Sequence, residues 1–151
     1  MMKKERIVLI LFILYSSTCC NLQKALLVVD INDISKSNRS QIEKKYGKPT
    51  AISHDKSIKY DQIFYSINEN DVYIEFEKNK PVWILIQNPK KAKFDSNPLI
   101  YFNLEAYKPD FSNYASKSWS NVPGFKEISV VSDQDGGLAQ IVFNISRKFN
   151  N

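Results

Sequence analysis

The sequence predicts an α+β fold in which two units, each a helix followed by an antiparallel meander, form one layer of sheet with the helices packed on one face. Two segments carry helix start and stop signals, and the segments between them alternate apolar and polar residues as strands do. The order of elements is the same in both halves, which indicates an internal duplication with half-units 38–87 and 98–146 joined by a linker at 88–97. The alternative is that a helix over a meander is simply a common way to cover a sheet.

The N-terminal segment 1–20 has the pattern of an export signal. Basic residues precede an apolar run from Ile7 to Tyr15, and small polar residues then lead to two cysteines. This run has the length of a signal-peptide core and is far shorter than the roughly 20 apolar residues that span a membrane. We therefore expect a signal peptide at 1–20, a tether or strand at 21–37, and a single α+β domain at 38–151.

The end of this segment resembles the lipobox of bacterial lipoprotein precursors. The matching residues are Ser16-Ser17-Thr18 before Cys19, or Ser17-Thr18-Cys19 before Cys20. The resemblance implies lipidation at Cys19 or Cys20 and an anchor at the bacterial envelope, facing the periplasm. No aspartate follows Cys20 directly, which favours the outer membrane. The alternative is ordinary cleavage that releases a secreted protein.

The composition of the exported part limits its partners and its chemistry. No cysteine follows Cys20, so an internal disulfide is excluded there and stability must come from a hydrophobic core. The chain has a formal net charge of +5, but its acidic and basic residues are interspersed. We interpret Lys90-Lys91-Ala92-Lys93 as a solvated linker, and we expect no nucleic-acid partner because such partners need basic residues clustered on one face.

The first half predicts one helix and three strands. A helix is predicted over Asn38–Tyr46, with Gln41 in the capping-box position and Gly47 as part of the stop signal. Strands are predicted at 58–67, 72–77 and 82–86, separated by turn residues. Because 82–86 is apolar on both faces, we expect a central strand or one that is covered on both faces there.

The second half predicts a similar order. Asn97 and Pro98 start a helix that continues through Tyr107, and strands follow at 117–119, 127–132 and 138–145. The segment Asp133-Gln134-Asp135-Gly136-Gly137 is predicted to be the loop of the last hairpin. It resembles a fragment of a calcium loop, but the remaining ligands are missing, so we interpret it as a plain hairpin loop.

The first half also resembles small periplasmic lipoprotein domains of the SmpA/OmlA type. The resemblance covers about Asn38 to Gln87 and rests on the capped helix, Tyr46-Gly47-Lys48-Pro49 and the strands that end in Glu75-Phe76-Glu77-Lys78-Asn79-Lys80-Pro81-Val82. Those families have leucine where this chain has Tyr46. The beta-lactamase inhibitor proteins share the architecture as a tandem repeat. The resemblance implies helices on an antiparallel sheet that serves protein contacts.

Candidate catalytic residues are few. His54 is the only histidine and lies beside Asp55 in a predicted loop, which is too little for a nucleophile–base pair or a zinc site. An enzyme would need Asp61, Glu75 and His54 to converge in one cleft. We therefore expect no enzymatic activity, no cofactor and no metal.

Aromatic residues are the remaining functional lead, with Tyr73, Trp83, Tyr65 and Trp119 as candidate partner-binding residues. Tyr73 shares a strand face with glutamates, so its side chain is expected to be exposed, and Trp83 is expected on the same face across the hairpin. Aromatic side chains commonly anchor binding surfaces. The alternative is that strands favour aromatic residues in any case.

These observations favour a non-enzymatic exported lipoprotein that acts as a protein-binding or scaffold module of the bacterial cell envelope. Its expected partners are an envelope protein and, through the lipid anchor, the membrane. The alternative is a secreted proteinaceous inhibitor of an enzyme, which requires release instead of lipidation.

Overall fold

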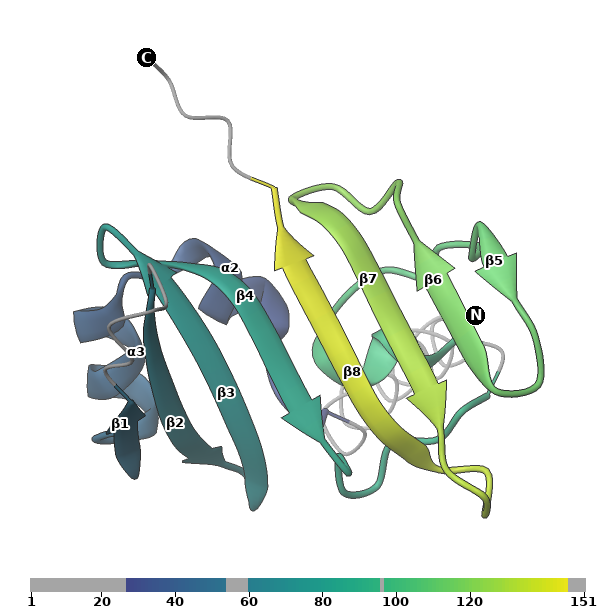
Figure 1. Cartoon of the computed structure of the whole chain (residues 1–151), viewed down its shortest axis with the longest axis horizontal. Coiled ribbons are helices and arrows are strands. Elements are labelled where there is room, and N and C mark those ends of the chain that lie inside the picture. Colours follow the sequence, from purple (N-terminus) through teal and green to yellow (C-terminus); the bar gives the residue numbers. More distant parts are fainter. Residues whose placement is uncertain (1–26, 54–59, 96, 147–151) are drawn as a thin grey trace, which may run out of the picture.

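The computed structural model describes residues 27–53, 60–95 and 97–146, which form one eight-stranded antiparallel sheet with short helices behind it (Figure 1). The strand order is β1-β2-β3-β4-β8-β7-β6-β5, so the last strand of each half pairs with the other at the centre. The described part is mostly β. The predicted α+β class, built from two helix-plus-meander units, is therefore wrong.

Helix α3, Arg39–Tyr46, confirms the first predicted helix. The Gln41 amide donates to Asn38 Oδ1 at 2.9 Å and the Asn38 amide donates to Gln41 Oε1 at 2.8 Å, which is a complete capping box. Gly47 ends the helix with φ of 95°, a value that favours glycine.

A six-residue helix, α2 (Ile31–Lys36), lies where the sequence predicts a tether or strand. Asp30 caps it by accepting a hydrogen bond from the Asp33 amide at 2.9 Å. Ile31 and Ile34 are buried, as are Val28 and Val29 just before it. This segment therefore belongs to the core of the domain.

The second predicted helix is wrong in type and length. Only Pro98–Phe102 is helical, as the 3₁₀ helix η1, and Asn103 ends it in the left-handed region. The Asn97 side chain makes no capping hydrogen bond. The segment Leu99–Phe102 is a continuous run of β-branched and aromatic residues after a leucine, and such residues have low helix propensity. Among the described residues, the second half-unit therefore has only this five-residue 3₁₀ helix where the α+β prediction requires an α-helix.

The first four strands are joined largely by tight turns. They are β1 (Ala51–Ser53), β2 (Asp61–Ile67), β3 (Asn70–Glu77) and β4 (Lys80–Gln87). The two-residue turns Asn68-Glu69 and Lys78-Asn79 have positive φ at both positions, as type I′ hairpin turns require. Strand β4 pairs with β3 and β8, which confirms the predicted central strand.

The second four strands are β5 (Phe111–Ser112), β6 (Ser116–Trp119), β7 (Phe125–Ser132) and β8 (Leu138–Ile145). In the loop between β7 and β8, Asp133 Oδ1 accepts hydrogen bonds from the backbone amides of Asp135 and Gly137. This carboxylate therefore stabilises the turn of a hairpin, and the predicted hairpin loop is confirmed. Both edge strands, β1 and β5, are very short, which limits pairing with another chain.

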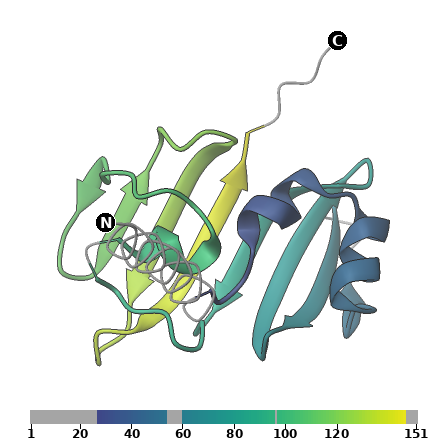
Figure 2. The same cartoon turned by 180° about the vertical axis from the view of Figure 1, so that it is seen from behind.

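The core lies between the helices and one face of the sheet. Seen from behind, the blue helices and the green 3₁₀ helix all lie over this face (Figure 2). We call it the covered face, and the opposite side the open face. The largest fully buried side chains are Trp119, Tyr65, Phe102, Phe143, Ile31, Ile34, Ile42, Ile63, Ile67, Ile74, Ile84 and Ile86.

Candidate binding surface on the open face

An unbroken apolar row crosses the middle of the open face. Phe64 on β2 pairs with Tyr73 on β3, Tyr73 with Leu85 on β4, and Leu85 with Val142 on β8. All four side chains are half-buried, and the rings of Phe64 and Tyr73 meet edge to face with centroids 4.8 Å apart. We call these four residues the apolar row.

A second row lies beside the first, two residues further along each strand. It contains Gln62, Glu75, Trp83, Asn144 and Glu127, each paired with the next across the strands. Gln62 Nε2 donates to Glu75 Oε1 at 2.9 Å, which holds one carboxylate beside the tryptophan. We call these five residues the acidic row.

Two shallow hollows adjoin the acidic row, one between it and the apolar row and one on its other side. The smaller, about 180 Å³, is lined mainly by side chains of the two rows, including Tyr73, Glu75 and Trp83. The larger, about 270 Å³, again includes Glu75 and Trp83 and adds Glu77 and Lys126. The open face therefore offers an apolar depression directly beside a charged one.

The structure brings together two of the four predicted aromatic residues. Tyr73 and Trp83 both line the smaller hollow on the open face, although both are half-buried. Tyr65 and Trp119 do not share this surface, because they lie on the covered face with exposed fractions of 2% and 1%. The indole of Trp119 donates to the Tyr107 carbonyl at 2.8 Å, so its one polar group is satisfied within the fold.

Tyr65 is an unusual core residue because its hydroxyl lacks a hydrogen-bond partner among the described residues. Burial raises the pKa of Tyr65 to about 12, and the negative charge of Glu43 adds to the rise while Arg39 opposes it. Arg39 Nε and Glu43 Oε1 form an ion pair at 2.8 Å on α3. The tyrosine is therefore held neutral under a helix.

Sequence reasoning missed Leu85 and Val142 as parts of the surface. Leu85 follows Trp83 by two residues, so the period of a strand already places both side chains on one face. Val142 joins them only through the pairing of β4 with β8. That contact links strands more than fifty residues apart in the sequence, and no local sequence pattern predicts it.

The carboxylates considered for catalysis do not converge. Asp61 begins β2 on the same side as Ile63, which is the covered face, whereas Glu75 lies on the open face. His54 lies outside the described residues, as do Cys19 and Cys20. Within the described ranges, no group of three histidine, cysteine, aspartate or glutamate residues is placed to hold a metal ion.

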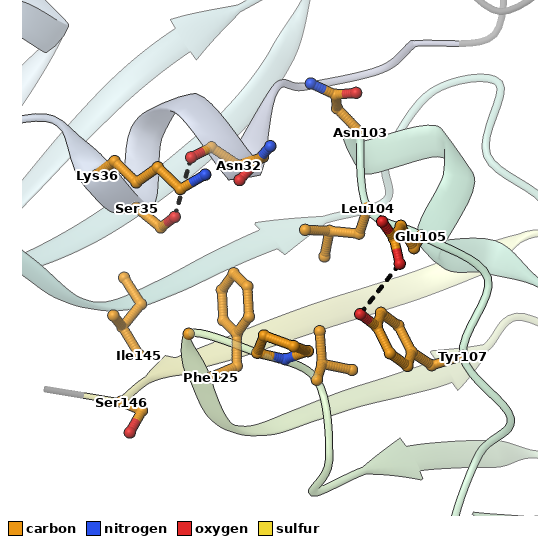
Figure 3. A pocket seen from close by; sticks show the side chains of 13 residues that line it. Asn32, Ser35, Lys36, Asn103, Leu104, Glu105, Tyr107, Phe125, Ile145 and Ser146 are labelled. Atoms are coloured by element: carbon orange, nitrogen blue, oxygen red, sulfur yellow. Dashed lines mark hydrogen bonds between the residues drawn. The ribbon is translucent and has the colours of Figure 1, made fainter.

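The covered side has a larger cleft of about 510 Å³ between α2, the segment 103–107 and the 122–125 turn. Figure 3 shows Asn32, Ser35 and Lys36 on one side, Glu105 and Tyr107 on the other, with Glu105 accepting a hydrogen bond from the tyrosine at 3.2 Å. The described residues that line it include neither histidine nor cysteine and only one carboxylate.

Among the described residues, no helix is long and apolar enough to cross a membrane.

Comparisons with known proteins leave the family of this chain open. No family model and no curated protein sequence matches the chain. Its structure is similar to that of a cysteine-rich secretory protein from Staphylococcus aureus, with 13% sequence identity and a TM-score of 0.49. The similarity covers 78% of this chain and 46% of that protein, so this chain spans less than half of its length, and no argument about activity follows from it.

Proposed function

We propose that this protein is a non-enzymatic, exported and lipid-anchored module of the bacterial envelope that binds a protein partner through the open face of its sheet. The observation that carries the proposal is the apolar row. Four apolar side chains lie side by side on a face that no described helix covers, and polar residues border them.

The side chains of the apolar row are adjacent to one another across four strands. Single apolar residues are common on protein surfaces, whereas adjacent ones on a polar background mark interaction sites. Aromatic rings such as those of Tyr73 and Trp83 contribute large contact area at a small cost in conformational entropy. Both are already half-buried by their neighbours on the sheet, so their orientation is largely set before a partner arrives.

The location proposed for the protein rests on the sequence of residues 1–20. Lipidation at Cys19 or Cys20 would leave a thioether-linked lipid on the mature N-terminus. The intact mass of the mature protein tests this directly. An acylated cysteine supports the anchored module, whereas an unmodified protein recovered from the culture medium supports the secreted inhibitor.

Photo-crosslinking in cells tests the binding face. We expect p-benzoylphenylalanine in place of Tyr73 to give a covalent adduct with a protein, because position 73 lies at the centre of the apolar row. The same group in place of Lys44, an exposed residue of α3, is the matched control and is expected to give none. An empty result at positions 73 and 85 would overturn the proposed binding face.

A further inference from the structure

The charge on the open face differs in sign from that of the chain. The sequence carries a formal net charge of +5. The strand registers nevertheless place only two lysines, Lys80 opposite Glu77 and Lys126, on or beside the described part of this face, against the four carboxylates Asp71, Glu75, Glu77 and Glu127. Many of the basic residues lie elsewhere, for example Lys44 and Lys45 on α3. The open face is therefore an acidic surface on a basic protein.

Trp83 lies at the centre of this charge. Glu75 is its direct partner on β3, and Asn144 on β8 separates it from Glu127 on β7. Neighbouring strands are about 4.8 Å apart, so carboxylates stand roughly 5 Å and 10 Å to the two sides of the indole at the level of the backbone. A cation held over the ring would gain from the π face and from both carboxylates.

The apolar row lies immediately beside this position. Two residues along a strand correspond to about 7 Å, which is the separation between the acidic row and the apolar row. Side chains of alternate residues in an extended segment, or of residues three or four apart in a helix, have similar spacing. One short segment of a partner can therefore reach both rows at once.

We propose that the partner of the open face presents a lysine or arginine side chain next to an apolar side chain. The cation lies over Trp83 between Glu75 and Glu127, and the apolar side chain enters the hollow of about 180 Å³ beside Tyr73. This inference rests on the proposed function, because it specifies the chemistry of a partner bound at that face.

Charge reversal in the crosslinking experiment tests the inference. With p-benzoylphenylalanine in place of Tyr73, we expect Glu75→Lys combined with Glu127→Lys to lower the adduct yield by at least about tenfold, because facing like charges cost more than the 1.4 kcal/mol that a tenfold change represents. Glu69→Lys combined with Glu105→Lys changes the net charge equally away from the open face and is expected to leave the yield within about twofold. Glu69 lies in the β2–β3 turn, and Glu105 lines the cleft on the covered side.

A variant that neutralises the two charges instead of reversing them, together with the sequence of the crosslinked partner segment, distinguishes the possible outcomes. Glu75→Gln with Glu127→Gln preserves side-chain shape and is expected to lower the yield about threefold, with the melting temperature of each variant measured alongside. Mass spectrometry of the adduct is expected to place a lysine or arginine within four residues of the attachment point, the reach of one helical turn. An adduct that is insensitive to both pairs of substitutions, or a segment without a basic residue, overturns this inference and leaves the proposed binding face intact. The absence of any crosslinked protein at positions 73 and 85 overturns both this inference and the proposed binding face.

Discussion

Phe64 and Tyr65 are consecutive residues of β2 that lie in different environments. Tyr65 points into the covered face, where only 2% of its surface is exposed, while Phe64 is half-buried on the open face against Tyr73. The same contrast separates Trp119 from Trp83, one inside the core and one on the surface. Aromatic content alone therefore does not mark the binding surface, because the period of two in a strand sends neighbouring rings to opposite faces.

The two faces are also stabilised differently. The core side chains of the covered face, such as Ile63, Ile84 and Phe143, are enclosed between the sheet and the helices, so each loses nearly all its contact with water. Side chains on the open face rest on their cross-strand neighbours and keep one side in solvent. Truncation on the covered face leaves a cavity, whereas truncation on the open face removes a contact that is worth about 1 kcal/mol or less.

The largest expected difference is between the two tryptophans. Trp119→Ala removes a side chain that is 1% exposed together with its indole hydrogen bond, and we expect the free energy of unfolding to fall by about 3–5 kcal/mol. Trp83→Ala is expected to cost roughly 1 kcal/mol, the scale of a cross-strand pair. Urea denaturation of both variants measures the difference. Equal losses would show that the open face is as enclosed as the core.

The hairpins and the face of Tyr73 and Trp83 could be predicted from the sequence because their causes are local. Asn68 and Asn79 lie in turns that require positive φ, and asparagine tolerates that region. Once the turns are placed, the period of two puts Tyr73, Glu75 and Trp83 on one face. The capping box at Asn38 is equally local.

The wrong predictions have non-local causes. Periodicity shows that Tyr65 and Trp119 each belong to one face, but it does not show which face the helices cover. The second helix is shorter than predicted: Leu99 and Phe102, three residues apart, are buried on one side of a 3₁₀ helix, and Asn103 ends it in the left-handed region. The pairing of β4 with β8, which completes the apolar row at Val142, depends on strands far apart in the sequence.

A smaller effect tests whether the open face is ordered before a partner binds. Phe64 and Tyr73 meet edge to face with an interplanar angle of 79°. In a double-mutant cycle with Phe64→Ala and Tyr73→Ala, we expect a coupling energy of about 0.5–1.5 kcal/mol, as is usual for aromatic pairs of this geometry. Thermal or urea unfolding of the four proteins measures it. Strict additivity would mean that the two rings do not hold each other in solution.

A small effect at neutral pH is expected for Tyr65→Phe, which removes only the hydroxyl that has no hydrogen-bond partner among the described residues. Because that oxygen is buried without compensation, we expect its loss to be neutral or to stabilise the fold by up to about 1 kcal/mol. The matched control, Tyr73→Phe, removes a hydroxyl from the half-buried open face. We expect it to leave the free energy of unfolding within about 0.5 kcal/mol.

The two variants are expected to diverge in alkaline solution. Burial raises the pKa of Tyr65 to about 12 in the folded protein, whereas an unfolded tyrosine titrates near 10. Between those values the unfolded state binds fewer protons than the folded state, so the free energy of unfolding falls as the pH rises. The raised pKa of Tyr65 therefore has no effect on the free energy of unfolding well below pH 10, and it lowers that free energy progressively as the pH rises toward 12. Urea denaturation at pH 8 and pH 11 is expected to show a smaller fall in the free energy of unfolding for Tyr65→Phe than for the wild type. Tyr73→Phe retains Tyr65 and therefore retains the fall that Tyr65 causes. An identical fall in the free energy of unfolding for the wild type and Tyr65→Phe would show that the hydroxyl of Tyr65 reaches water. The two faces of β2 would then differ less in solvent exposure than the burial of this ring indicates.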